Sequence, residues 1–139
     1  MSEVIELLEY TVNELGDISN PKYVLETDPV SKAIDLMKEN HIGSCLVIDE
    51  NVKLKGIFTE RDVLNKVVNH DESLTQEIKH YMTENPQTIQ ANDSVVIALS
   101  MMTHGKFRNL PVVNMEGRAV GAISISDIML FFTNHLKDD

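Results

Sequence analysis

Two stretches of the chain place apolar residues three and four positions apart, which is the spacing of an amphipathic helix. Each stretch follows a dipeptide suited to the start of a helix, Asp28-Pro29 in the first and Asp93-Ser94 in the second. The apolar positions are Val30, Ala33, Ile34 and Met37 in the first stretch and Val95, Ala98, Leu99 and Met102 in the second. We therefore predict two helices, which end near Asn40 and Gly105 because both residues tolerate a left-handed backbone.

Shorter apolar runs surround each predicted helix and are typical of strands. The predicted strands cover residues 23–26, 44–49 and 54–59 in the first half and 87–90, 109–114 and 119–124 in the second. A further helix closes each half, over residues 60–69 and 125–136. Each half is thus predicted to have the order β-α-β-β-α.

The two halves are copies of one unit. A shift of 65 residues aligns residues 20–64 with residues 85–129 without a gap, and nine aligned pairs are identical. A unit of roughly 60 residues buries too little surface to be stable alone, so the copies are expected to pack together. We predict an α/β (α+β) fold of two β-α-β-β-α repeats with pseudo-twofold symmetry, preceded by an N-terminal helix.

The repeat divides the chain into four parts. We assign residues 1–19 to the N-terminal helix and lead-in, 20–72 to repeat one, 73–84 to a linker helix and 85–139 to repeat two. An apolar stripe on an acidic helix over residues 2–15 is formed by Val4, Leu8, Val12 and Leu15. We interpret this stripe as a cover for the core or a dimer seam, and a helix that docks a partner is the alternative.

The charge is acidic and uneven. The chain has 12 basic and 22 acidic residues, a net charge of −10, which disfavours nonspecific nucleic-acid binding. Of these, residues 1–85 hold 8 basic and 17 acidic residues, whereas residues 86–137 hold 4 and 3, so an anion site is favoured in the second half. No apolar run approaches the ~18 residues of a membrane span, and the acidic start differs from a leader peptide. We expect a cytoplasmic protein with no nucleic-acid or membrane partner.

Both repeats carry a glycine, two apolar residues, a hydroxyl residue and, three positions later, an aspartate. The pattern is Gly56, Thr59 and Asp62 in repeat one and Gly121, Ser124 and Asp127 in repeat two. One interpretation is a helix capping box, which needs only the hydroxyl and the acid. The other is a ligand site, since such a strand-to-helix junction offers N–H groups and a hydroxyl to a phosphate, and a carboxylate to ribose hydroxyls.

Five stretches are specific when they are taken together and in order: NPKYVLETDPVSKAIDLM, GIFTERDV, YMTENPQTIQANDSV, KFRNLPVV and GAISISDI. Over residues 12–136 the chain resembles a tandem pair of cystathionine-beta-synthase (CBS) domains, a Bateman module. The resemblance implies a regulatory module that binds AMP, ADP, ATP or S-adenosylmethionine between its repeats, forms a homodimer and acts on a separate partner protein. The alternative is a scaffold with empty clefts.

No enzyme is expected, since the sequence shows no nucleophile–base–acid set, no metal-ligand cluster and no phosphate-binding loop. Accordingly, we expect no catalytic cofactor and no metal site. The single cysteine, Cys45, cannot form an internal disulfide and is interpreted as a small buried residue.

The resemblance also implies two ligand clefts. The main cleft would hold the ribose with Asp127, the phosphate with Ser124, Ser126 and Arg108, and the adenine with Lys22, Tyr23 and Ile42. The second cleft would use Asp62 for the ribose, Thr59 and Arg61 for the phosphate, and Gln87, Thr88 and Phe107 for the adenine. The position of Arg108 is held by Gly43 in repeat one, so a phosphate-bearing ligand is expected to fill the Asp127 cleft first. A solvated surface charge is the alternative role for Arg108.

Overall fold

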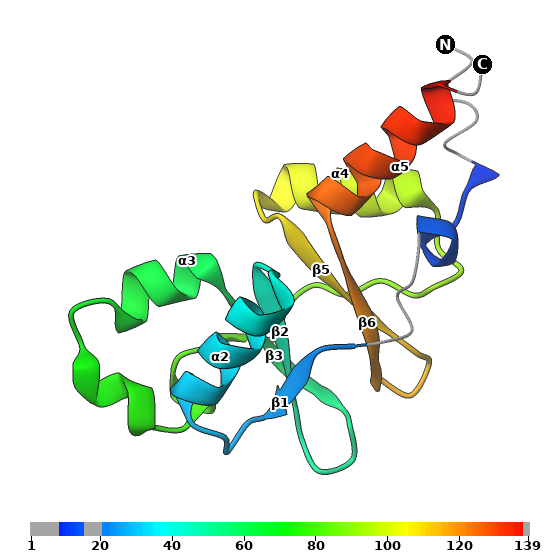
Figure 1. Ribbon diagram of the computed structural model, residues 1–139. Coiled ribbons are helices and arrows are strands. Elements are labelled where there is room, and N and C mark those ends of the chain that lie inside the picture. Colours follow the sequence, from blue (N-terminus) through cyan, green and yellow to red (C-terminus); the bar gives the residue numbers. More distant parts are fainter. Residues whose placement is uncertain (1–8, 16–20, 138–139) are drawn as a thin grey trace. The chain divides into compact units, whose positions relative to one another are not determined.

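The computed structural model describes residues 9–15 and 21–137, excluding the side chains of residues 136 and 137 (Figure 1). The chain forms two compact units. Unit 1 consists of Met1–Asn20, Gln87–Met115 and Val120–Asp139, and unit 2 consists of Pro21–Pro86 and Glu116–Ala119. Repeat two therefore lies mainly in unit 1 and repeat one in unit 2.

Unit 2 is built on a four-stranded sheet in the order β1-β2-β3-β4. The strands are β1 (Tyr23–Leu25), β2 (Ser44–Ile48), β3 (Leu54–Thr59) and β4 (Thr83–Glu84). Strands β1 and β2 are parallel, whereas β2–β3 and β3–β4 are antiparallel. The helical elements are α2 (Val30–Asn40), α3 (Glu60–Asp62), the π-helical turn η2 (Val63–Val67), and the 3₁₀ turns η3 (Asp71–Thr75) and η4 (Ile78–His80). The helix predicted over 60–69 is thus one α-helical turn that continues as a π-helical turn.

Unit 1 repeats the plan with fewer strands. It contains the 3₁₀ turn η1 (Val12–Leu15), helices α4 (Val95–Gly105) and α5 (Ile125–Lys137), and a sheet of β5 (Asn109–Val113) and β6 (Ala119–Ser124). The strand predicted over 87–90 is reduced to a single bridge between Ile89 and Val112. Proline explains the loss. In unit 2 the Leu46 N–H donates to the carbonyl of Lys22 at 3.0 Å, but Leu46 is replaced by Pro111, which has no N–H to donate.

The predicted starts of helices α2 and α4 are only partly confirmed. Ser94 caps α4, because its hydroxyl accepts a hydrogen bond from the Val96 N–H at 3.1 Å. The carboxylate of Asp28 instead accepts the N–H of Leu25 at 2.8 Å, and Asp93 does the same with Gln90. The two aspartates therefore close the turn before each helix rather than cap the helix itself.

Helices α2 and α4 end at Asn40 and Gly105, as predicted, but the left-handed residue is the next one in each case. The left-handed residues are His41, with a φ of 55°, and Lys106, with a φ of 58°. Asn40 stays helical, and its side-chain amide donates to the carbonyl of Leu36 at 2.8 Å. Both ends occur at positions related by the 65-residue shift, so the repeat is present in the backbone as well as in the sequence.

Each unit is closed by a segment that precedes the other repeat in the sequence. In unit 1, Val12 donates its N–H to the carbonyl of Asp93, and Tyr10 accepts the N–H of Val95. In unit 2, Ile78 donates to Asp28 and Gln76 accepts from Val30 in the same way. Segment 76–79, which lies within the predicted linker, therefore completes the unit of repeat one. Segment 10–13 completes the unit of repeat two in the same way.

The N-terminal segment is not one continuous α-helix in its described part. Thr11 forms a β-bridge with Ser94, and a 3₁₀ turn follows from Val12 to Leu15. Val12 is fully buried and Leu15 packs against the same core, so the interpretation of these two residues as a core cover is confirmed. Val4 and Leu8 lie outside the described residues.

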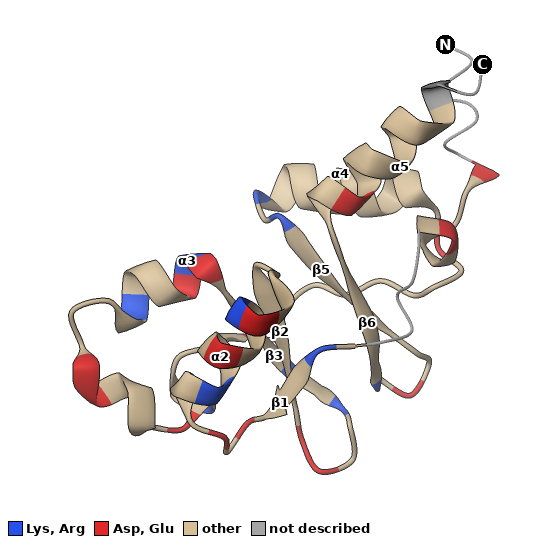
Figure 2. Cartoon of the chain, viewed as in Figure 1, with Lys and Arg blue, Asp and Glu red and all other residues tan. Residues whose placement is uncertain are grey.

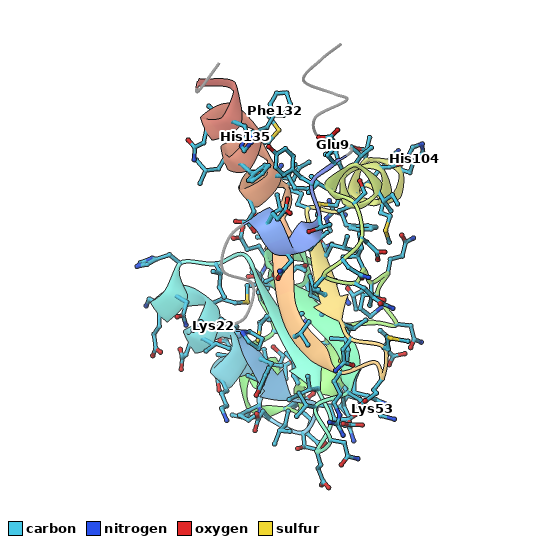
Figure 3. The ribbon with its side chains drawn as sticks, turned by 90° about the vertical axis from the view of Figure 1, so that its right-hand side faces the viewer. Glu9, Lys22, Lys53, His104, Phe132 and His135 are labelled. Atoms are coloured by element: carbon cyan, nitrogen blue, oxygen red, sulfur yellow. The ribbon has the colours of Figure 1, made fainter. Side chains whose placement is uncertain are left out.

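An aromatic cluster attaches this segment to α5. The Tyr10 hydroxyl is hydrogen-bonded to Nε2 of His135, and the Tyr10 ring lies edge-on to Phe131 with centroids 5.1 Å apart. The rings of Phe131 and His135 are stacked at 4.8 Å. Figure 3 labels His135 on α5 and Glu9, the residue before Tyr10. The cluster links the first described residues of unit 1 to its last helix.

The two cores are built mostly from equivalent positions. The core of unit 1 contains Val12, Ile89, Val95, Ala98, Met102, Leu110, Val112, Ile123 and Ile128. The core of unit 2 contains Val24, Val30, Ala33, Met37, Cys45, Val47, Phe58, Val67, Ile78 and Met82. Burial raises the pKa of the Cys45 thiol to about 12, so this residue is a buried apolar group and not a thiolate. In the part of the chain that the structure describes, no helix is long and apolar enough to cross a bilayer.

Candidate functional site

The strand-to-helix junction of repeat two brings four predicted ligand residues together within unit 1. We define the repeat-two junction as residues 121–127 together with Arg108. Ser124 ends β6, and Ser126 and Asp127 lie in the first turn of α5. The backbone N–H of Ile125 donates to the carbonyl of Arg108 at 2.9 Å, which holds Arg108 against the start of α5. The junction thus gathers two hydroxyls and one carboxylate, with the backbone of Arg108 beside them.

The carboxylate of Asp127 is only partly used by the protein. Its Oδ2 accepts the N–H of Ser124 at 2.7 Å, and the Ser124 hydroxyl accepts the N–H of Asp127 at 3.1 Å. These reciprocal bonds are a capping box, so the first interpretation is confirmed for this position. Asp127 is exposed, and among the described residues none donates to its Oδ1. One carboxylate oxygen is therefore open to a ligand, and the two interpretations are compatible.

The equivalent junction of repeat one has the same backbone but a covered carboxylate. We define the repeat-one junction as residues 56–62 together with Gly43. Thr59 and Asp62 form the same capping box, with Oδ2 of Asp62 accepting the Thr59 N–H at 3.0 Å. Unlike Asp127, Asp62 is only 5% exposed. Its Oδ1 lies 2.9 Å from the ammonium of Lys66 and accepts the hydroxyl of Thr83 at 3.1 Å.

Strand β4 covers the repeat-one junction. A Cβ at Gly56 would lie 2.5 Å from Sδ of Met82 and 2.7 Å from the carbonyl oxygen of Thr83. Glycine is needed here because β4 pairs with β3 at this point, with Gly56 opposite Glu84. In repeat one, therefore, the space beside the glycine is filled by Met82 and Thr83 of the chain itself and is not left for a ligand.

The two junctions differ in charge at one equivalent position. In both, the first residue of the closing helix donates its N–H to the residue before the inner strand: Glu60 to Gly43 at 3.1 Å, and Ile125 to Arg108 at 2.9 Å. A Cβ at Gly43 would lie 2.8 Å from Oε1 of Glu60, so a carboxylate lies over this glycine. Figure 2 shows a further acidic segment on α2 in the same unit. Repeat one thus presents negative charge where repeat two presents Arg108.

The guanidinium of Arg108 is exposed, and no residue in the described ranges forms an ion pair or hydrogen bond with it. Arg118, by comparison, lies 3.7 Å from Glu116. An arginine that forms no ion pair is available to an anion, since each guanidinium presents five donors.

The residues predicted to contact adenine are divided between the units. Lys22 and Tyr23 lie at the start of β1 and Ile42 follows α2, all in unit 2. The carbonyl of Lys22 is already bonded to the Leu46 N–H within the sheet. Gln87, Thr88 and Phe107 lie in unit 1 with Asp127, whereas Thr59, Arg61 and Asp62 lie in unit 2. Each predicted cleft therefore draws on residues of both units, and its assembly stays a prediction.

Gln87 also lines a shallow open cavity of about 390 Å³ beside α4. The other lining residues are Ile97, Ser100, Met101, His104 and Gly105. His104 (Figure 3) is held within its own helix, since its Nδ1 lies 2.8 Å from the carbonyl oxygen of Ser100. Nowhere in the described ranges do three His, Cys, Asp or Glu side chains gather closely enough to hold a metal ion.

Sequence reasoning missed the two residues, Lys66 and Thr83, whose side chains occupy Oδ1 of Asp62. Lys66 follows Asp62 by four positions, a spacing that favours an ion pair on a helix and was a usable signal. Thr83 is 21 residues away, and only the pairing of β4 with β3 brings it close. The ammonium of Lys66 also donates to the carbonyls of Tyr81 and Met82, at 3.1 and 3.4 Å.

Comparisons with known proteins agree with this architecture. The sequence model of one family, described as CBS domain, matches residues 12–69 and 78–134. An uncharacterised 17.7 kDa protein of Acidianus ambivalens is 33% identical over 99 residues, which cover 71% of this chain. The chain spans only 59% of the length of that relative.

Solved structures give the same result. A CBS-domain-containing protein of Agrobacterium tumefaciens has a TM-score of 0.78 and 31% identity, covering 87% of this chain and 98% of its own. A CBS domain protein of Pyrobaculum aerophilum, complexed with AMP, has a TM-score of 0.78 and 23% identity, covering 90% of this chain and 99% of its own. The likeness to the second protein is one of fold.

Proposed function

The chain belongs to the CBS domain family, and on this premise we propose that it is a non-catalytic regulatory module that binds an adenosyl ligand. The observation that carries the proposal is the repeat-two junction. There, an open oxygen of Asp127 and the residues Ser124 and Ser126 lie at the start of α5, where the backbone of Arg108 is hydrogen-bonded, and no described residue pairs with the Arg108 guanidinium. A carboxylate accepts ribose hydroxyls and a guanidinium binds phosphate, so the junction suits the ribose-phosphate part of a nucleotide.

The main site consists of the residues implied by the family resemblance. Asp127 holds the ribose, and Ser124, Ser126 and Arg108 face the phosphate. Lys22, Tyr23 and Ile42 contact the adenine. The second site, with Asp62, Thr59, Arg61, Gln87, Thr88 and Phe107, stays a prediction, and the contacts of Asp62 argue against it.

AMP, ADP and ATP are the ligands we favour, with S-adenosylmethionine as a further member of the class. The AMP complex of the Pyrobaculum aerophilum protein supports the adenosyl class. A bound nucleotide regulates a separate partner protein only if it binds one conformation more tightly than another. A cytoplasmic location also stays a prediction.

A melting-temperature screen tests the proposal. We expect at least one of AMP, ADP, ATP and S-adenosylmethionine to raise the melting temperature. A ligand present at about 100 times its dissociation constant stabilises the folded state by about 2.7 kcal/mol. Adenine-free ribose 5-phosphate is the control and should have a smaller effect. An unchanged melting temperature with all four ligands would contradict the proposal and favour the ligand-free scaffold.

We also propose that the chain forms a homodimer through the closing helices of its repeats. Leu64 and Val68 near η2 are 71% and 46% exposed, and Met129 and Leu130 on α5 are 54% and 63% exposed. Leu64 and Met129 occupy equivalent positions of the repeat. Exposed apolar side chains on the same element of both repeats are typical of an association surface.

Light scattering at micromolar concentration should give twice the chain mass of 15.7 kDa. Leu64→Glu and Leu130→Glu should each shift the protein toward the monomer, because a charge would be buried in the interface. Met115→Glu is the matched control, since Met115 is 90% exposed and lies on neither helix. A monomer mass for the unmodified chain would rule out the homodimer.

A further inference from the structure

The repeat-one junction uses its own side chains to satisfy the carboxylate that its family resemblance assigns to a ribose. Oδ2 of Asp62 accepts the N–H of Thr59 at 3.0 Å and the Thr59 hydroxyl at 3.2 Å. Oδ1 lies 2.9 Å from the Lys66 ammonium and accepts the Thr83 hydroxyl at 3.1 Å. Both oxygens are therefore engaged, and the side chain is 6% exposed. A ribose could bind Asp62 only by displacing these partners.

The partners of Asp62 form a connected brace between the start of α3 and segment 81–83. Lys66 donates to the carbonyls of Tyr81 and Met82 as well as to Asp62, so all three of its N–H donors have acceptors. Among the described residues the repeat-two junction has no such brace, because a continuation of the 65-residue shift places Phe131, which carries no donor, at the position of Lys66. The difference between the two aspartates thus follows from one residue on each closing helix and from the pairing of β4.

The charge beside the repeat-one junction opposes a phosphate. The carboxylate of Glu60 lies over Gly43, at the position where repeat two carries Arg108. The equivalent of Glu60 in repeat two is Ile125, which is uncharged. Like charges a few ångströms apart repel even near a protein surface. Glu60 therefore places a negative charge where repeat two carries Arg108, and the neighbouring Arg61 offsets this repulsion only in part.

We infer that the chain binds a single equivalent of a phosphate-bearing adenosine ligand, and that Lys66, Thr83 and Glu60 exclude this ligand from the repeat-one junction. Asp62 is accordingly a structural residue that holds segment 81–83 against α3. This inference rests on the proposed function, because it concerns which of two equivalent junctions takes the ligand.

Titration calorimetry with AMP on the full chain tests the stoichiometry. The unmodified protein should bind one AMP per chain. The double variant Glu60→Ile, Lys66→Met should bind a second, because it removes the repelling carboxylate and the ion-pair partner of Asp62, which leaves Oδ1 with the uncharged Thr83 hydroxyl, a partner that a ribose hydroxyl can replace. The matched control is Lys38→Met, Glu39→Ile, which makes the same charge changes at exposed positions of α2 and should keep one equivalent. Two equivalents in the unmodified protein, or one in the double variant, would overturn the inference.

A ligand-independent measurement distinguishes this inference from the proposed function. Asp62→Asn should lower the urea midpoint of unfolding, because it weakens an ion pair whose carboxylate is buried, whereas Asp127→Asn should leave the midpoint nearly unchanged. Failure of the unmodified protein to bind AMP would count against AMP as the ligand, and the midpoints would still test the brace. Equal midpoints for the two variants would overturn the structural role of Asp62. The same comparison decides the matter if the double variant does not fold.

Discussion

Asp127→Ala and Arg108→Ala should each weaken AMP binding by about ten- to 150-fold. Each variant removes a charged partner of the nucleotide, and a hydrogen bond to a charged group contributes about 1.5–3 kcal/mol. At about 1.4 kcal/mol per tenfold change, this free energy corresponds to the stated loss of affinity. Titration calorimetry on the folded full chain measures it directly.

Three further variants separate binding from folding in this experiment. Asp127→Asn keeps an oxygen that can accept the Ser124 N–H, so α5 keeps its cap while the charge offered to the ribose is lost. Arg118→Ala removes an exposed arginine from the turn between β5 and β6 and should leave the affinity unchanged. Asp62→Ala should leave the affinity for the bound equivalent unchanged. Loss of the tighter binding event in Asp62→Ala, with full binding in Asp127→Ala and Arg108→Ala, would reverse the ranking of the two junctions.

The repeat could be predicted because local patterns and long-range structure agree in both copies. The 65-residue shift that aligns the sequence also aligns the hydrogen bonds: Ile42 donates to Met37 in one unit, and Phe107 donates to Met102 in the other. The C-terminal ends of helices α2 and α4, at Asn40 and Gly105, were predicted correctly. Their apolar spacing and turn residues act within a few positions of the chain, where sequence is informative.

The predictions that failed depend on a partner far away in the sequence or on a missing donor. The strand over 87–90 is lost because Pro111, on a different strand, cannot donate a hydrogen bond. The cover over Asp62 depends on Thr83, which reaches it only after β4 pairs with β3. No periodicity in the sequence encodes either pairing. The equivalence of Asp62 and Asp127 in the sequence therefore concealed a difference in burial and hydrogen bonding.

In the candidate site, too, residues close together in the sequence could be predicted to lie together, whereas a residue from a distant segment could not. Ser124, Ser126 and Asp127 could be placed together because they follow one another across a strand-to-helix junction. The backbone of Arg108 is held beside them by a single hydrogen bond from the Ile125 N–H. The same hydrogen bond joins Glu60 to Gly43 in repeat one, but the sequence shows neither bond. The opposite charge at these two equivalent positions is visible in the sequence. Its consequence follows only once both residues are known to lie at the junction.

Ile78→Ala should destabilise the protein by about 2–5 kcal/mol, the usual cost of truncating a large aliphatic side chain in a core. Ile78 is fully buried in the core of unit 2, and its N–H donates to the carbonyl of Asp28 at 2.8 Å. It is the counterpart of Val12, which closes the core of unit 1. Segment 76–79 is therefore a structural part of repeat one, although its position in the sequence resembles that of a linker.

Urea unfolding at equilibrium measures this effect, and Ile97→Ala is the matched control. Ile97 is 52% exposed on α4, so the same truncation there should change the free energy of unfolding by no more than about 0.5 kcal/mol. A linker that only connects two finished domains would tolerate both substitutions equally. Equal free energies of unfolding for the two variants would thus show that segment 76–79 does not complete the core of repeat one. A loss confined to Ile78→Ala would show that repeat one needs residues beyond its own β-α-β-β-α unit to fold.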